Sequence, residues 1–308
     1  METKPLGRSG LRVSVVGLGC NNFGMRCDQA QTRAVVAKAL DLGVTLFDTA
    51  DVYGPRGVSE EYLGKALENR RGDVIVATKF AMPMGESPLM RGGSRRWVMK
   101  AAEASLRRLG TDYIDLYQMH FPDAGTPIEE TLRALDDLVR QGKVRYVGCS
   151  NFSGWQVVEA AWTAKSASLA PFVSAQNFYN LLERNVEKEL VPACNAYGLG
   201  VLPYFPLASG LLTGKYKRGE SAPAGTRLSA ARFAAALNDK NFDRVEKLAE
   251  FAAGAGHTLL ELAIGWLASQ PHVPSVIAGA TSPEQVEANV RAGEWKLSAA
   301  ELAKVGEL

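Results

Sequence analysis

Short apolar runs rich in β-branched residues alternate with longer amphipathic segments along the whole chain, and this alternation constrains the fold more than any other feature. The runs recur at intervals of about 38 residues, the spacing that a (β/α)8 TIM barrel of roughly 250 residues requires. We therefore expect one α/β barrel domain over residues 1–308. The predicted strands are Val13–Val16, Thr45–Phe47, Val74–Thr78, Ile114–Met119, Val144–Gly148, Val173–Gln176, Gly200–Pro203 and Val276–Ala278.

The amphipathic segments between these strands are predicted as helices, and several begin with a serine that can accept from the free amides of the first turn. The predicted helices are Gln31–Leu42, Glu60–Glu68, Arg95–Leu109, Ile128–Gln141, Gly154–Lys165, Glu183–Ala196, Lys240–Ala253 and Thr258–Ser269, with Ser59, Ser94 and Ser153 as caps. Because the last two helices both precede the final strand, one of them is additional to the ideal barrel.

Three segments fall outside this alternation. Lys4–Val13, with glycines at its bend, predicts a hairpin ahead of the first strand. Long segments rich in Gly, Pro and Ser follow the third and seventh strands, at Phe80–Gly93 and from Phe205 to about Leu237. In a barrel, such loops lie at the carboxyl ends of the strands, so we expect them to cover the substrate and cofactor.

An open, doubly wound sheet is the alternative fold, suggested by the glycines of residues 17–22 directly after a strand. The third glycine of that dinucleotide-binding pattern is replaced by Asn22, and no acidic residue follows a second strand at the ribose position. The closed barrel is therefore preferred, and the two glycines present are interpreted as backbone room at a strand end.

The composition limits what this barrel can bind. Thirty-five Lys and Arg residues nearly balance 33 Asp and Glu residues, and the formal net charge of +2 gives no overall field to attract nucleic acid or a membrane surface. Any charged ligand must be held locally. Three histidines and four cysteines lack the close spacing of metal ligands, so no metal is expected.

The compartment is inferred from what the sequence lacks. It has no apolar signal segment at its start and no dense cysteine framework, which favours a reducing cytoplasm. Cys149 and Cys194 are expected in the core, whereas Cys20 and Cys27 fall on the first rim loop and are expected to be exposed.

Polar residues end three neighbouring strands. Asp48 and Tyr53 follow the second strand, Lys79 ends the third, and His120 ends the fourth. Buried Asp and Lys are rare unless paired, so a purely structural Asp48–Lys79 ion pair is one interpretation. In the functional interpretation, the ammonium lowers the Tyr53 pKa from near 10 toward 7, which takes about 4 kcal/mol. Tyr53 then protonates a carbonyl oxygen that His120 hydrogen-bonds, and with a hydride donor the site reduces that carbonyl.

Seven motifs occur in order at the predicted strand ends: Phe47–Gly54, Ala77–Lys79, Gln118–His120, Gly148–Phe152, Gln176–Asn180, Pro206–Tyr216 and Gly279–Gln285. Together they resemble the aldo-keto reductase superfamily, and within it the bacterial, channel-β-subunit-like branch. The resemblance implies NADPH or NADP+ as the cofactor. It also implies a catalytic tetrad of Asp48, Tyr53, Lys79 and His120.

The resemblance also assigns the cofactor site. It implies that Ser150, Asn151 and Gln176 hold the nicotinamide carboxamide and that Tyr204 stacks on the ring. It implies that Leu207, Ser209, Gly210 and Thr213 bind the pyrophosphate. It implies that Lys215, Arg227, Thr281 and Gln285 surround the adenosine 2′-phosphate. Asn289 is assigned to the adenine, and Gly279 is a cofactor-binding residue at the end of the last strand. Two cations at the 2′-phosphate favour NADPH over NADH.

We therefore expect an NADPH-dependent oxidoreductase that reduces aldehydes or ketones to alcohols. One alternative is a cofactor-binding, redox-sensing regulatory subunit of a potassium channel; His120 favours catalysis, since the resemblance implies a different residue there in such subunits. Another is a barrel that isomerises sugars or phosphate esters without nicotinamide, which would leave Gln176 and Tyr204 without a role.

Overall fold

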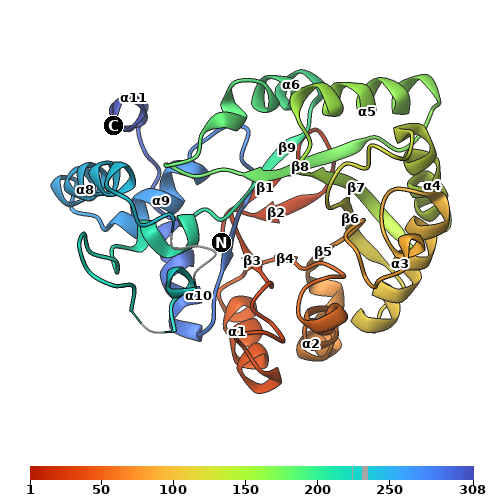
Figure 1. Ribbon diagram of the computed structural model, residues 1–308, viewed down its shortest axis with the longest axis horizontal. Helices are drawn as coiled ribbons and strands as arrows, with labels where there is room; N and C mark the ends of the chain where they lie inside the picture. Colours follow the sequence, from red (N-terminus) through yellow and green to blue (C-terminus); the bar gives the residue numbers. More distant parts are fainter. Residues whose placement is uncertain (224, 231–234) are drawn as a thin grey trace.

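A ring of eight parallel strands surrounded by helices forms the centre of the computed structural model, which describes residues 1–223, 225–230 and 235–308 (Figure 1). The strands follow each other in the order β10-β3-β4-β5-β6-β7-β8-β9, and β9 contacts β10, so the barrel is nearly closed. The predicted (β/α)8 TIM barrel is confirmed. The strands are β3 (Val16–Gly19), β4 (Leu46–Asp48), β5 (Ile75–Phe80), β6 (Ile114–Met119), β7 (Val144–Ser150), β8 (Phe172–Phe178), β9 (Gly200–Tyr204) and β10 (Val276–Gly279).

The helices lie around the outside of this ring (Figure 1). They are α1 (Gln29–Asp41), α2 (Val58–Leu67), α3 (Arg95–Leu109), α4 (Ile128–Arg140), α5 (Gly154–Ser166), α6 (Leu190–Tyr197), α8 (Asp239–Gly254), α9 (Leu259–Ala268), α10 (Pro283–Ala292) and α11 (Ala299–Glu307). Both α8 and α9 precede β10, as predicted. In the described part of the chain, no single helix has the length and apolarity to cross a membrane, although α8 and α9 together meet that test across a bend of 88°.

The amino-terminal hairpin closes the end of the barrel at which the strands begin, opposite their carboxyl ends. Strands β1 (Thr3–Pro5) and β2 (Arg12–Ser14) pair antiparallel, which confirms the predicted hairpin. Its leucines pack among apolar side chains that point into the barrel, including Leu46 and Leu202. Gly7 has φ +59°, and a Cβ atom there would lie 2.4 Å from a backbone oxygen, so only glycine fits this turn.

Two predicted elements were wrong in position. The apolar run Val13–Val16 is divided between the hairpin and the barrel, because the amide of Val15 donates to Glu2 and the chain bends there; the first barrel strand is β3. The helix predicted from Glu183 begins only at Leu190, after a 3-10 turn.

Three side chains also differ from expectation. Ser59 does not cap α2, which follows Gly57; its hydroxyl instead donates to the carbonyl of Cys20 at 2.8 Å. Cys20 and Cys27 are buried rather than exposed, because the loop after β3 folds its sulfur atoms inward. Ser94 and Ser153 do cap α3 and α5.

Candidate active site

A cavity of about 750 Å3 opens at the carboxyl ends of the barrel strands. Asp48, Tyr53 and His120 line one end of it, whereas Lys79 lies behind them and is fully buried. Every residue predicted to bind the cofactor also lines this cavity. The second long loop lines it as predicted, from Phe205 to Arg227 among the described residues, whereas no residue of the first long loop, Phe80–Gly93, is part of the lining.

Lys79 and Asp48 form a buried ion pair at the floor of the cavity. Lys79 Nζ lies 2.5 Å from Asp48 Oδ2 and also donates to the carbonyl of Thr49 at 2.8 Å. Burial disfavours the ammonium, but Asp48 and Tyr53 outweigh that effect and raise the pKa of Lys79. The lysine therefore stays charged at neutral pH.

Tyr53 is held against this ammonium. Its hydroxyl lies 3.5 Å from Lys79 Nζ, which also sits 4.9 Å from the centre of the phenol ring. Lys79 acts to lower the Tyr53 pKa, but the loss of solvent around the phenol is the larger effect, and the pKa is raised above 10. The predicted shift toward 7 is therefore wrong in this structure, and Tyr53 keeps its proton at neutral pH.

His120 lies beside Tyr53, with ring centres 5.7 Å apart and planes at 80°. Burial, and then the charge of Lys79, lower the His120 pKa from 6.5 to about 3, so the imidazole is neutral. Its Nδ1 atom is buried and has no hydrogen-bond partner among the described residues. The Asn151 side chain donates to its backbone carbonyl at 2.9 Å and fixes the end of β6.

The residues predicted for the carboxamide form one hydrogen-bonded group above the tetrad. Both ends of the Asn151 side chain bond within the protein: Nδ2 donates to Ser150 Oγ and Oδ1 accepts from Tyr204 Oη at 2.8 Å. The Ser150 hydroxyl proton and Gln176 Oε1 have no partner among the described residues. Ser150 and Gln176 therefore keep hydrogen-bonding capacity toward the cavity, and Asn151 holds the Tyr204 ring in place.

The loop after β9 supplies the next part of the cavity wall, with Leu207, Ser209, Gly210 and Thr213 in the lining. Ser209 and Gly210 have φ of 59° and 98°, which turns this backbone toward the cavity. A Cβ atom at Gly210 would lie 2.9 Å from Lys215 Nζ, so the glycine makes room for the lysine. Lys215 forms no ion pair with the described residues.

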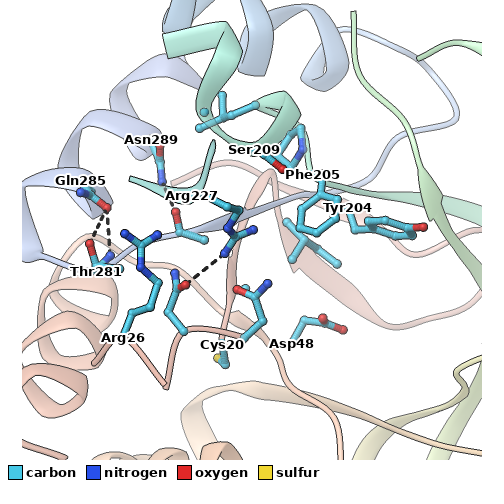
Figure 2. A pocket seen from close by; sticks show the side chains of 18 of the residues that line it. Cys20, Arg26, Asp48, Tyr204, Phe205, Ser209, Arg227, Thr281, Gln285 and Asn289 are labelled. Carbon is cyan, nitrogen blue, oxygen red and sulfur yellow. Dashed lines mark hydrogen bonds between the residues drawn. The ribbon is translucent and has the colours of Figure 1, made fainter. Parts of the chain in front are cut away.

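The far end of the cavity is built from the β10–α10 connection and the second long loop. Figure 2 shows this end, with Thr281 and Gln285 joined by hydrogen bonds and Arg227 facing them across the cavity. Arg227 Nη2 donates to Asn22 Oδ1 at 3.1 Å. Asn289 Nδ2 approaches the carbonyl of Gly279 at 3.5 Å, which brings the last predicted residues together.

Sequence reasoning missed three contributors. Gln118 donates to Asp48 Oδ1 at 3.1 Å beside Gln176, which donates at 2.8 Å, so both amides orient the carboxylate. Arg26 lines the far end of the cavity from the loop after β3. Phe205 lines it too, with its ring 5.3 Å from the Arg227 guanidinium. Alternation along β6 points Gln118 inward and could have identified it; nothing in the sequence predicts where Arg26 points.

The barrel and the site at its carboxyl end define a class of protein. Comparison with known proteins identifies that class. The model of the Aldo/keto reductase family matches residues 15–308. The chain therefore belongs to the aldo/keto reductase family and is an oxidoreductase. Members of this family generally use NADH or NADPH.

Three relatives indicate where in the family it lies. The chain is 40% identical over 301 residues to a probable voltage-gated potassium channel subunit beta of Oryza sativa subsp. japonica, covering 95% of this chain and 91% of that protein. It is 39% identical over 307 residues to the uncharacterized oxidoreductase YrpG of Bacillus subtilis, covering 96% and 92%. It is 35% identical over 321 residues to L-glyceraldehyde 3-phosphate reductase of Escherichia coli, covering 100% and 92%.

Proposed function

We propose that this protein is an NADPH-dependent oxidoreductase that reduces aldehydes or ketones to alcohols, with Tyr53 as the general acid. One observation carries the proposal: a single cavity has the Tyr53–Lys79–Asp48 hydrogen-bonded chain at one end and arginine and lysine side chains at the other. The only carboxylate in the described lining, Asp48, is already paired with Lys79. The arginine and lysine side chains at the far end therefore suit an anionic cofactor.

The residues present fit NADPH. Ser150 and Gln176 have hydrogen-bonding capacity left for a carboxamide, and the Tyr204 ring is fixed by Asn151. Lys215, Arg227, Thr281, Gln285 and Asn289 would surround the adenosine end, with the cations at the 2′-phosphate. When bound, the dihydronicotinamide ring supplies the hydride for carbonyl reduction.

The four tetrad residues would control proton transfer to the carbonyl oxygen of the substrate. Tyr53 is protonated at neutral pH and so can donate to the carbonyl oxygen as negative charge develops there. Lys79 stabilises the phenolate that remains, and Asp48 holds the ammonium in place. Neutral His120 can hydrogen-bond the same oxygen without competing as an acid.

Two measurements test the proposal. NADPH should quench the protein fluorescence with much higher affinity than NADH; equal affinities would contradict the 2′-phosphate assignment. Tyr53→Phe should bind NADPH normally but reduce 4-nitrobenzaldehyde about 100- to 10,000-fold more slowly. Tyr62→Phe, on α2 outside the cavity lining, is the matched control and should keep normal rates. Normal turnover by Tyr53→Phe would assign the acid to another group.

A regulatory, redox-sensing role is the second candidate, favoured by the 40% identity to the rice channel-subunit protein. The two roles differ in turnover. An enzyme should consume many equivalents of NADPH per protein with a good aldehyde, whereas a sensor should bind NADPH tightly and stop after about one equivalent.

A further inference from the structure

Arg26 brings a further positive charge to the adenosine end of the cavity. Figure 2 shows its guanidinium between the Thr281–Gln285 pair and Arg227. The side chain is exposed and forms no ion pair with any described carboxylate. Its one hydrogen bond within the described chain runs from Nη2 to the carbonyl oxygen of Gly225, so most of its donors remain available.

The loop that carries Arg26 is built to hold it there. The carbonyl of Asn22 accepts from the amides of Met25, Arg26 and Cys27 at 2.8 to 3.1 Å, which folds residues 22–27 into a compact turn. Cys27 is buried next to the carbonyl of Thr281. The Arg26 backbone is therefore anchored directly against the connection that contributes Thr281 and Gln285.

Two arginines cross the cavity in opposite directions. Arg26 reaches from the loop after β3 to Gly225 in the second long loop, and Arg227 reaches back from that loop to Asn22. The guanidinium of each arginine therefore lies near the segment of chain that carries the other arginine. A phosphate group between them could accept from both, since guanidinium groups bind phosphate through several donors at once.

We propose that Arg26 is a third cationic ligand of the cofactor 2′-phosphate, with Lys215 and Arg227, and that it determines the preference for NADPH. This inference rests on the proposed function. Because a neutral 2′-hydroxyl cannot use the charge, Arg26 contributes little to the binding of NADH.

Binding measurements on the full chain test this without any turnover. The probes are NADPH, NADH, 2′,5′-ADP and 5′-ADP, titrated by calorimetry into wild type and Arg26→Gln. The variant should bind NADPH and 2′,5′-ADP about tenfold more weakly, which corresponds to about 1.4 kcal/mol, and bind NADH and 5′-ADP as wild type does. The loss should shrink at high salt, because the interaction is exposed to solvent.

Arg96→Gln is the matched control, since Arg96 is also exposed and donates to a backbone carbonyl, at Leu89, but lies outside the cavity lining. It should leave all four affinities unchanged. Equal weakening of NADPH and NADH by Arg26→Gln would overturn the proposal and make Arg26 a tie between the two loops. Unchanged NADPH affinity would overturn it as well. Wild type that binds NADPH no better than NADH would instead contradict the proposed function itself.

Discussion

Removing one partner of the Lys79–Asp48 pair should destabilise the fold far more than removing both. Lys79 is fully buried and Asp48 is 3% exposed, with 2.5 Å between Nζ and Oδ2. Lys79→Met leaves the carboxylate buried with only the Gln118 and Gln176 amides, and Asp48→Asn leaves the ammonium with the Thr49 carbonyl and Tyr53. Each single change should cost about 3–5 kcal/mol of unfolding free energy.

The double variant Asp48→Asn, Lys79→Met contains neither charge. Its cost should fall to about 1–3 kcal/mol, the usual loss for disrupted buried hydrogen bonds, although both singles and the double should be inactive. Urea unfolding at pH 7, followed by fluorescence and circular dichroism, measures the three values against wild type. The two charges should thus couple by several kcal/mol in the free energy of unfolding, and the proposed mechanism requires both of them for turnover.

A surface ion pair provides the comparison. Arg33 and Glu68 are 67% and 53% exposed, so the same cycle with Arg33→Met and Glu68→Gln should give a coupling below about 1 kcal/mol. If the costs of Asp48→Asn and Lys79→Met simply add in the double variant, the two charges do not stabilise each other and the reasoning is refuted.

Two further predictions concern pH. Asp51 is buried, and neither of its carboxylate oxygens has a partner among the described residues; burial, and then Glu60, raise its pKa well above the usual value. The native state thus binds a proton that the unfolded state releases, so the free energy of unfolding falls as pH rises past about 4. The Asp51→Asn variant should therefore be about 1–3 kcal/mol more stable than wild type at pH 8 but not at pH 4. Lower stability of Asp51→Asn at pH 8 would show that the charged form is needed. With a pKa of about 3, His120 should show no titration between pH 5 and 8 by NMR; a transition near 6.5 would mean that the imidazole is hydrated and that its assigned neutral role is wrong.

The strand–helix alternation was sufficient to predict the barrel because each element has a distinct period, and the predicted bounds of α3 and β6 agree with the structure. The error at Val13–Val16 has a physical reason. Its residues are buried on both sides of the bend at Val15, since one part fills the barrel end and the other forms its wall. A short run rich in buried valines does not reveal where the chain turns.

The candidate site was predictable where position along a strand determines direction. The ends of β4, β5 and β6 meet at one edge of the ring, so Asp48, Lys79 and His120 had to lie close together. The direction of the Tyr53 pKa shift was not predictable in this way, because it depends on how completely the fold removes water from the phenol. The hydrogen bond between Tyr204 and Asn151 was not predictable either, because it depends on how residues 53 positions apart in the sequence pack together.

The tetrad also depends on polar groups behind the barrel wall. Successive residues of a strand face opposite sides, so Thr78 points outward where Lys79 points inward. Thr78 donates to the buried carboxylate of Glu60, which Arg108 pairs from α3 at 2.6 Å. The strand that carries Lys79 is thus tied on one face to Asp48 and on the other to α2 and α3. Because a buried charge tolerates little displacement from its partner, these two ion pairs restrict the same short stretch of β5 from both sides and keep the ammonium within reach of Tyr53.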